Sequence, residues 1–288
     1  MKESSNRIVE RYCLLGHPVG HSLSPVFQNA GFRVLGLGVS YGLRDVLPED
    51  LGACFSDLRS SHYGWNVTIP HKEAAVGLVD ELDDVARVLG SVNTVVNEDG
   101  YLRGYSTDGY GLERSLEESF GVDLRGLRLC FLGCGGAARA CSIYAAMRGA
   151  GELILVNRTR SRAEALCAEV IKAGGHARVV DHEAVDELSE RLQGVDVLVQ
   201  CTSLGLRGGD PLPYPVELLP AGLLVMDMIY GESRFLRLAE SRGHRTTDGR
   251  GMLLHQGCRS FELWTGRSAP VEAMRSALWE ALSAGGKK

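Results

Sequence analysis

The sequence contains no long uninterrupted apolar segment and no stripe of basic residues. Its longest apolar runs are strand-sized, far short of the roughly 20 residues that a membrane-spanning helix needs. Residues 1–7 include no apolar segment, so we expect no signal peptide. Lysine and arginine (31) are outnumbered by aspartate and glutamate (36), which gives a net charge of −5 and argues against nucleic-acid binding. We therefore expect a cytoplasmic protein that binds neither nucleic acids nor membranes.

Paired cysteines and metal-binding spacings are also missing. The eight cysteines form no Cys-x-x-Cys pair, and none has the neighbours that would complete a zinc site. Several lie inside apolar runs, such as Cys130 within Leu129-Cys130-Phe131-Leu132. We expect reduced, mostly buried thiols and no metal ion.

What the chain has is a regular alternation of short apolar runs with amphipathic stretches, which is typical of βα units. Its 288 residues are enough for two domains, each with a core of its own. A helix expected over 109–120 would connect them, with a boundary near Asp108. Strands are expected at 12–16, 39–43, 65–69, 91–96, 101–105, 127–132, 153–156, 177–180, 195–199 and 223–228. Further helices are expected at 25–35, 48–58, 137–148, 161–173, 233–242, 252–264 and 270–284.

A glycine-rich segment follows the expected strand at 127–132. Gly133, Gly135 and Ala138 fit the pattern Gly-x-Gly-x-x-Ala between a strand and a helix, the context that a dinucleotide-binding loop requires. The first glycine permits a tight turn, the second lets the backbone approach a pyrophosphate, and the small third residue lets helix and strand pack closely. Free N–H groups at the helix start would then face the phosphates. The alternative is a purely structural glycine turn. A Walker loop is excluded, because no Gly-Lys-Ser/Thr follows.

The residues after the strand at 153–156 indicate which dinucleotide is bound. An acidic residue there would accept hydrogen bonds from the ribose of NAD, but this chain reads Asn157-Arg158-Thr159-Arg160-Ser161-Arg162. Guanidinium groups suit a 2′-phosphate, which they bind in a fork geometry. We therefore expect NADP rather than NAD. The alternative is an exposed basic turn at the start of a helix.

Four polar residues of the N-terminal half are candidates for chemistry. Lys72 and Asp108 offer an amine and a carboxylate ahead of the dinucleotide loop, a combination that indicates proton transfer paired with hydride transfer. Ser22 and Ser24 place two hydroxyls where a helix is expected to start, with Pro25 at its first position. These hydroxyls would bind a carboxylate, or Ser24 would merely cap the helix.

Together these motifs resemble the shikimate dehydrogenase family. The resemblance runs in order from about residue 12 to residue 265 and rests on eight segments. They are residues 21–25, 66–72, 91–94, 107–109, the loop at 133, 157–159, 227–230 and 251–257. It implies an N-terminal α/β substrate domain, a Rossmann-like NADP-binding domain, and NADPH-dependent reduction of 3-dehydroshikimate to shikimate in aromatic amino-acid (chorismate) biosynthesis.

The resemblance also implies roles for individual residues. Lys72 and Asp108 would form the catalytic pair. Ser22 and Ser24 would hold the substrate carboxylate, and Tyr230 would line the pocket between the domains. The ring hydroxyls would be bound, or their binding groups braced, by Asn66, Thr68, Asn93 and Gln256. The cofactor would be held by Gly133, Gly135, Gly136, Ala137, Ala138, Asn157, Arg158, Thr159, Arg162, Thr202 and Met252. Because Gln256 is expected at the substrate, residues 252–288 should pack back on a substrate domain over 1–108, leaving 109–251 as the NADP-binding domain.

In the mechanism that this implies, a charged Lys72 stabilises the forming alkoxide and donates a proton to it. Asp108 holds Lys72 in place and tunes its pKa. The chemical alternative is a Schiff base on Lys72, which hydride transfer to a ketone does not need. No metal is required.

Three single residues and one turn depart from the usual pattern of the family. Ser106 and Gln200 each replace an Asn, Leu206 replaces a Met, and residues 231–234 replace a turn that contains proline. These changes concern the packing beside Asp108 and the cofactor contacts around Thr202.

Three alternatives stay open from the sequence. The chain could be a quinate dehydrogenase or an aminoshikimate dehydrogenase of the same family, or a non-catalytic ligand sensor on the same fold. Ser24 favours shikimate, since quinate enzymes of the family often carry Thr there, and the Arg158 cluster argues against NAD. The intact pair of Lys72 and Asp108 argues against a sensor. The expected partner is a small-molecule substrate, and the protein could be a monomer or a homodimer.

Overall fold

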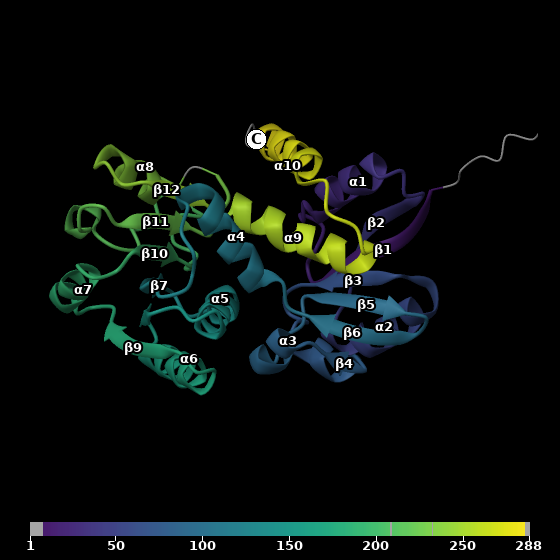
Figure 1. Cartoon of the computed structure of the whole chain (residues 1–288), viewed down its shortest axis with the longest axis horizontal. Coiled ribbons are helices and arrows are strands. Elements are labelled where there is room, and N and C mark those ends of the chain that lie inside the picture. Colours follow the sequence, from purple (N-terminus) through teal and green to yellow (C-terminus); the bar gives the residue numbers. More distant parts are fainter. Residues whose placement is uncertain (1–7, 208, 232, 286–288) are drawn as a thin grey trace, which may run out of the picture. The chain divides into compact units, whose positions relative to one another are not determined.

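The chain divides into two compact units (Figure 1). Unit 1 comprises Met1–Thr107 and Leu254–Lys288, and unit 2 comprises Asp108–Leu253. In this computed structural model, residues 8–207, 209–231 and 233–285 are described. The expectation of no signal peptide falls on residues 1–7 and lies outside them. The chain leaves unit 1 once, after Thr107, and returns to it after Leu253.

Unit 1 is built on a six-stranded mixed sheet in the order β2-β1-β3-β5-β6-β4. Its strands are β1 (Val9–Gly16), β2 (Val39–Asp45), β3 (Gly64–Val67), β4 (Glu81–Leu82), β5 (Thr94–Glu98) and β6 (Tyr101–Tyr105). Strands β2, β1 and β3 run parallel, whereas β5 is antiparallel to both β3 and β6. Its helices are α1 (Ser24–Val34), α2 (Leu51–Ser61), α3 (Asp84–Leu89), α10 (Val271–Gly285) and the 3₁₀ turns η1 (Pro48–Asp50) and η2 (Ala74–Leu78). The C-terminal helix α10 packs against α1.

The hairpin of β5 and β6 shows how local sequence sets register. Asp99 (φ 51°) and Gly100 (φ 94°) both adopt left-handed backbone conformations in the two-residue loop. Such loops suit Asp-Gly because their twist matches that of the flanking strands. The residues between the strands expected at 91–96 and 101–105 thus form the turn of a hairpin.

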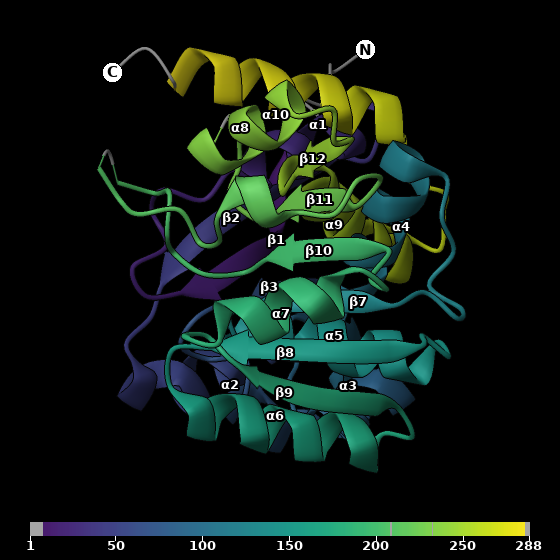
Figure 2. The ribbon, with the colours of Figure 1, turned by 90° about the vertical axis from the view of Figure 1, so that its left-hand side faces the viewer.

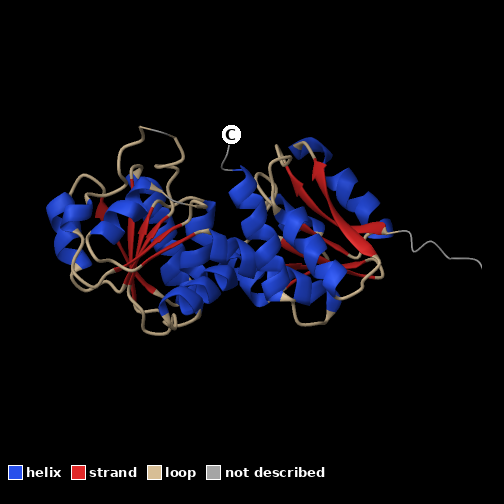
Figure 3. Ribbon diagram, turned by 90° about the horizontal axis from the view of Figure 1, so that it is seen from above, coloured by secondary structure: helices blue, strands red, loops and turns tan. Residues whose placement is uncertain are grey.

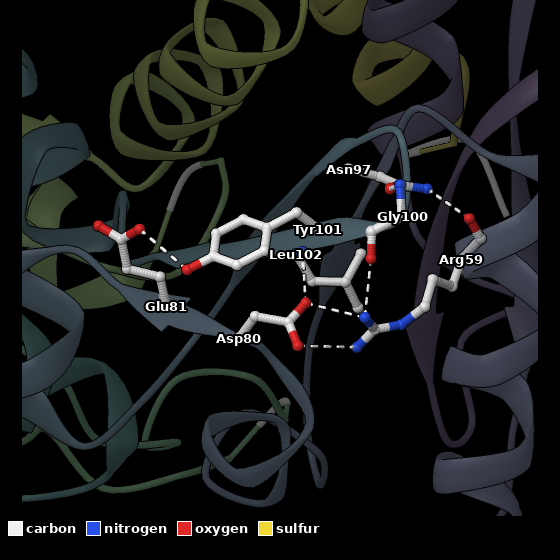
Figure 4. Close-up of polar contacts among 7 residues, drawn as sticks. All are labelled: Arg59, Asp80, Glu81, Asn97, Gly100, Tyr101 and Leu102. Carbon is white, nitrogen blue, oxygen red and sulfur yellow. Dashed lines mark hydrogen bonds and ion pairs between the residues drawn. The ribbon is translucent and has the colours of Figure 1, made fainter.

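A polar cluster fastens this hairpin to α2 (Figure 4). The Arg59 guanidinium donates to Asp80 Oδ2 at 2.8 Å and to the Gly100 carbonyl at 2.7 Å. Asp80 Oδ2 also accepts from the Leu102 N–H at 2.7 Å, and Asn97 Nδ2 donates to the Arg59 carbonyl at 2.9 Å. The Leu102 N–H and the Arg59 side chain both lower the pKa of Asp80.

Unit 2 is built on a six-stranded sheet in the order β12-β11-β10-β7-β8-β9, with every pair parallel (Figure 2). Its strands are β7 (Leu129–Leu132), β8 (Glu152–Asn157), β9 (His176–Asp181), β10 (Val197–Gln200), β11 (Leu224–Asp227) and β12 (Thr246–Asp248). Its helical elements are α4 (Asp108–Phe120), α5 (Gly136–Met147), α6 (Arg160–Lys172), α7 (Val185–Leu192), η3 (Val216–Leu218) and α8 (Arg234–Ser241). Counted within the unit, the strand order is 3-2-1-4-5-6, which is the Rossmann order.

The strands of unit 2 lie between helices (Figure 3), and β7 and β10 are buried along their whole length. Strands buried on both faces appear in a sequence as continuous apolar runs, which explains why they were predictable. The α/β fold with a Rossmann-like second sheet is thus confirmed. Helix α9 (Arg250–Thr265) begins in unit 2 and continues into unit 1.

Helices α3 and α7 and the short strands β4 and β12 were not expected. Each is too short to show a clear period of apolar residues. For α3 the end signals were present, because the Asp83 side chain accepts from the Ala86 N–H at 2.7 Å and Gly90 ends the helix at φ 57°. No helix in the described part of the chain is both long and apolar enough to cross a membrane.

Candidate active site

The glycine loop lies between β7 and α5 and contains two glycines with different surroundings. Gly133 has φ 102°, and a Cβ there would lie 2.9 Å from Thr202 Cγ2 and 3.0 Å from the Cys201 carbonyl carbon. Gly135, at φ −84° and ψ −175°, caps α5, and a Cβ there would have no heavy atom within 4 Å. The first glycine is therefore needed by the fold, whereas the second leaves an open face of backbone.

The position of this loop in the sheet is that of a ligand site. Strand β7 lies between β8 and β10, where the strand order reverses. Loops at the carboxyl ends of strands on either side of such a point form the crevice that binds ligands in open α/β sheets. The close approach of Gly133 to Thr202, which follows β10, shows that these two loops meet.

The basic turn after β8 is tied to the glycine loop by Asn157. Its Oδ1 accepts from the Cys134 N–H at 3.1 Å, and its Nδ2 donates to the Thr159 carbonyl at 2.9 Å. Both polar ends of the Asn157 amide are thus engaged with backbone. The arrangement supports a bracing role for this side chain, in addition to the predicted contact with the cofactor.

The arginines of this turn differ in their ion pairing. Arg160 pairs with Glu164 at 2.9 Å and with Asp181 at 3.5 Å. Arg158 and Arg162 are exposed, and neither forms an ion pair with any residue that the structure describes. Two guanidinium groups therefore remain available beside the glycine loop.

Gln200, one of the departures from the family pattern, closes the loop after β10. It is fully buried, its Nε2 donates to the carbonyls of Thr202 (3.2 Å) and Leu204 (3.0 Å), and its Oε1 accepts from the Thr202 N–H. The longer side chain thus fixes the loop against which Gly133 packs. Of the other departures, Leu206 is exposed, and residue 232 of the turn at 231–234 lies outside the described residues.

The two serines at the start of α1 contact each other. The Ser22 hydroxyl donates to Ser24 Oγ at 3.2 Å, and the Ser24 N–H donates to Ser22 Oγ at 3.2 Å. The prediction that Ser24 caps the helix is wrong, because α1 begins at Ser24, the cap residue is Leu23, and no side chain caps it. Ser22 Oγ instead accepts from the Ser24 N–H, and the Ser24 hydroxyl takes no part in capping the helix.

A buried polar network connects β3, β5 and α9. Asn66 Nδ2 lies 3.0 Å from both Thr94 Oγ1 and Ser260 Oγ, and these two hydroxyls are 2.8 Å apart. Asn66 Oδ1 accepts from the Tyr41 hydroxyl at 2.7 Å. Ser260 also donates to the carbonyl of Gln256, one turn earlier on α9. The structure thus brings Asn66 together with the helix that carries Gln256.

Asn93 extends this network to Thr107, the residue after which the chain leaves unit 1. Its Nδ2 donates to Thr107 Oγ1 at 2.9 Å, and its Oδ1 accepts from the Thr107 N–H at 2.9 Å and from the Thr94 hydroxyl at 2.9 Å. Thr107 is followed directly by Asp108, so Asn93 fixes the backbone from which Asp108 leaves the unit.

The segment that carries Lys72 is anchored on both sides. The Thr68 N–H donates to the Leu15 carbonyl at 2.8 Å, and the Lys72 carbonyl accepts from the Val92 N–H at 2.9 Å. The buried His71 ring contacts the Val46 carbonyl at 2.7 Å. Lys72 and Thr68 themselves are half-buried. The expected strand at 65–69 ends earlier, at Val67, so that Thr68 belongs to this loop.

Asp108 opens α4 in unit 2 and is buried. In the same unit Tyr230 is half-exposed, and burial of its phenol together with the charge of Asp108 raises the pKa of that phenol. The loop of Tyr230 is held by Asp248 Oδ2, which accepts from the Gly231 N–H at 3.0 Å. Lys72 belongs to unit 1 and Asp108 to unit 2, so their convergence stays a prediction.

Tyr41, Ser260 and Thr107 were not among the predicted site residues. In the sequence they stand in an expected strand, in an expected helix and beside Asp108, and nothing local distinguishes them. Met252, predicted at the cofactor, lies half-buried in the first turn of α9 in unit 2. No group of three or more possible metal ligands occurs within the described ranges.

A parallel sheet in Rossmann order has a glycine loop at its reversal point and, beside it, two arginines that form no ion pair with the described residues. These features define the class as a dinucleotide-binding α/β protein. Three family models match the chain. They describe a shikimate dehydrogenase substrate binding domain (residues 14–95), a shikimate / quinate 5-dehydrogenase (residues 115–205) and a shikimate 5′-dehydrogenase C-terminal domain (residues 249–278).

Individual proteins agree with these matches over nearly the full length. A shikimate dehydrogenase (NADP(+)) of Moorella thermoacetica is 44% identical, with 94% of this chain and 93% of that protein covered. The structure of a shikimate 5-dehydrogenase from Listeria monocytogenes, in complex with shikimate and NAD, gives a TM-score of 0.89 at 33% identity, covering 96% and 97%. A quinate dehydrogenase from Corynebacterium glutamicum, in complex with NAD, gives 0.87 at 27% identity, covering 95% and 99%. The chain belongs to the shikimate dehydrogenase family.

Proposed function

We propose that this protein is an NADP-dependent shikimate dehydrogenase, which reduces 3-dehydroshikimate to shikimate in the biosynthesis of chorismate and the aromatic amino acids. The observation that carries the proposal is the 44% identity to a shikimate dehydrogenase (NADP(+)) across 275 residues, which span both units. Unit 1 would be the substrate-binding and catalytic domain, and unit 2 the NADP-binding domain.

The residues of unit 2 fit the cofactor. The open face at Gly135 and the N–H groups that begin α5 suit the pyrophosphate. Arg158 and Arg162 would hold the 2′-phosphate, because their guanidinium groups form no ion pair among the described residues, whereas Arg160 is neutralised by carboxylates. Bound NADPH supplies the hydride.

The residues of unit 1 would bind the substrate and manage its proton. Ser22 and Ser24 would donate from their hydroxyls to the substrate carboxylate. Lys72 Nζ would stabilise the alkoxide that forms on the ring carbon and give it a proton. Asp108 would hold the Lys72 ammonium by its charge.

The bonding of Asn66 and Asn93 refines their predicted roles. The Asn66 amide is already engaged at both ends within the protein, which supports bracing of the site rather than direct binding of a ring hydroxyl. Asn93 would hold Thr107 so that Asp108 leaves unit 1 in a fixed direction.

We propose that the enzyme is cytoplasmic, and that it is a monomer or a homodimer. All eight cysteines lie in the described residues and all are free thiols, which suits a reducing compartment.

The second candidate is a quinate dehydrogenase. The fold does not separate the two, because the TM-scores to a shikimate and to a quinate enzyme are 0.89 and 0.87. Ser24 and the unpaired arginines favour shikimate with NADP.

The test is a panel of four assays on the purified protein, with shikimate or quinate and with NADP⁺ or NAD⁺, followed by absorbance of the reduced nicotinamide. We expect the highest kcat/KM with shikimate and NADP⁺. A higher value with quinate or with NAD⁺ would reject the assignment. Binding of shikimate without any turnover would instead identify a ligand sensor.

A further inference from the structure

Gln28, which the mechanism above does not use, is a fully buried amide on α1. Its Nε2 donates to the Gly257 carbonyl on α9 at 2.9 Å. Its Oε1 is also buried and accepts no hydrogen bond from the residues that the structure describes. The orientation of the amide follows from its chemistry, because only the nitrogen end can donate to a carbonyl oxygen.

The surroundings of this hydrogen bond are apolar. The Phe27 ring of α1 lies against Gly257, where a Cβ would come within 2.4 Å of the ring. The Phe261 ring of α9 lies against Gly31, where a Cβ would come within 2.9 Å of the ring. The two contacts are four residues apart on each helix, and they advance in the same direction along both. Helices α1 and α9 are thus joined by two contacts of a ring with a glycine, one turn apart, with the Gln28 amide beside the first.

Stability alone does not explain a glutamine at this position. The side chain is removed from water, and only one end of its amide forms a hydrogen bond with the described residues. A buried acceptor without a partner costs free energy, whereas an apolar side chain of the same shape would avoid that cost. A single polar group in an apolar helix contact can instead fix how the two helices are aligned. Gln28 has the position for this role, because its one hydrogen bond joins α1 to α9.

Two predicted substrate-binding residues depend on this alignment. Gln256 directly precedes Gly257 on α9, and Ser24 precedes Gln28 by four residues, about one turn of α1. Both therefore lie at the same end of the contact between the helices. A shift or rotation of α9 on α1 would change the distance between the amide expected at the ring hydroxyls and the hydroxyl expected at the carboxylate.

We propose that Gln28 is a positioning residue, which fixes Gln256 relative to Ser24 through its hydrogen bond to the Gly257 carbonyl. Gln28 itself needs no contact with the substrate. The inference rests on the proposed function, because it concerns the fit of a substrate that carries both a carboxylate and ring hydroxyls.

The test is Gln28→Met, which keeps the approximate volume of the side chain and removes the donor. KM for shikimate should rise roughly three- to tenfold, the scale of one hydrogen bond, while kcat and KM for NADP⁺ stay within about twofold. Tm should stay unchanged or rise, because the buried acceptor without a partner is removed as well. A lower Tm with unchanged KM would show that Gln28 only stabilises the fold, and would overturn the inference.

The matched control is Asn97→Ala, which removes another amide of unit 1 that donates to backbone carbonyls. Asn97 Nδ2 donates to the carbonyls of Arg59 at 2.9 Å and His62 at 2.7 Å, and neither residue belongs to α1 or α9. Tm should fall in this variant, while KM for shikimate stays within about twofold. A rise in KM equal to that of Gln28→Met would overturn the inference, because a general loss of stability would then explain both.

A double-mutant cycle tests whether Gln28 acts through Gln256. Gln256→Ala alone should raise KM for shikimate. Gln28→Met added to it should change KM no further, because the side chain that Gln28 positions is already absent. Additive effects of the two substitutions, or a Gln256→Ala variant with unchanged KM, would overturn the inference.

A second variant covers the case in which Gln28→Met does not fold. Gln28→Leu also places an apolar side chain of similar size at this position, and it should show the same rise in KM and the same lack of additivity with Gln256→Ala. If the unaltered enzyme turns over shikimate with NADP⁺ but the Gln28 variants keep its KM, only this inference fails. If the unaltered enzyme does not turn over shikimate with NADP⁺, the proposed function fails.

Discussion

Gly133 and Gly135 should respond to the same substitution in opposite ways. At Gly133 an alanine meets two costs, since its φ of 102° is unfavourable for an L side chain and its Cβ would lie 2.9 Å from Thr202 Cγ2. The backbone cost is about 1–3 kcal/mol, and crowding of a packed contact adds about 1–3 kcal/mol. Gly133→Ala should therefore destabilise unit 2 by roughly 2–6 kcal/mol, which for a unit of this size lowers Tm by roughly 5–20 °C.

Gly135→Ala should leave Tm nearly unchanged. The backbone there is extended, no heavy atom lies within 4 Å of the added Cβ, and the change at a helix cap amounts to less than about 1 kcal/mol. The added methyl group occupies the open face where the pyrophosphate is expected, so the Kd for NADP⁺ should rise at least tenfold, equivalent to about 1.4 kcal/mol.

The assay combines thermal unfolding without cofactor and calorimetric titration with NADP⁺, on both variants and the unaltered protein. If Gly135→Ala bound NADP⁺ as tightly as the unaltered protein, the pyrophosphate would not approach this backbone. A Gly133→Ala variant with unchanged Tm would refute the close packing between the glycine loop and Thr202.

Three further outcomes are expected. Lys72→Ala should lower kcat by roughly 10²–10⁴, the usual scale for a positioned acid or base, and near-normal kcat in steady-state assays would remove Lys72 from catalysis. Arg158→Ala should raise KM for NADP⁺ far more than KM for NAD⁺, whereas Arg160→Ala, whose guanidinium is already ion-paired, should change neither by much; equal changes with both cofactors would contradict the 2′-phosphate site. The lowered pKa of Asp80 contributes stability above its unfolded pKa of about 3.9, and this contribution is lost as the pH falls through the folded value. In acid, the free energy of unfolding should therefore depend less on pH in Asp80→Asn than in the unaltered protein, whereas the exposed Asp84→Asn should keep the dependence of the unaltered protein. The same pH dependence in both variants would exclude this linkage.

The sequence by itself determined the features that depend on neighbours in the chain. The apolar runs of the parallel strands, the glycine loop that follows residue 132 and the Asp-Gly turn of the hairpin are each encoded within a few residues. Their order along the chain also identified the family and, through the arginines after β8, the cofactor.

Only the tertiary structure decided which polar side chains act together. The Asn66 side chain forms hydrogen bonds with Ser260, which is 194 residues away in the sequence, and with Tyr41, which is 25 residues away. Arg160 pairs with Glu164 on its own helix and, unlike Arg158, also with Asp181, which lies at the end of β9. Such pairings depend on where distant strands and helices come to lie, and local conformational preference carries no information about them. For the same reason the sequence left the role of Ser24 open, whereas the fold excluded helix capping by its hydroxyl.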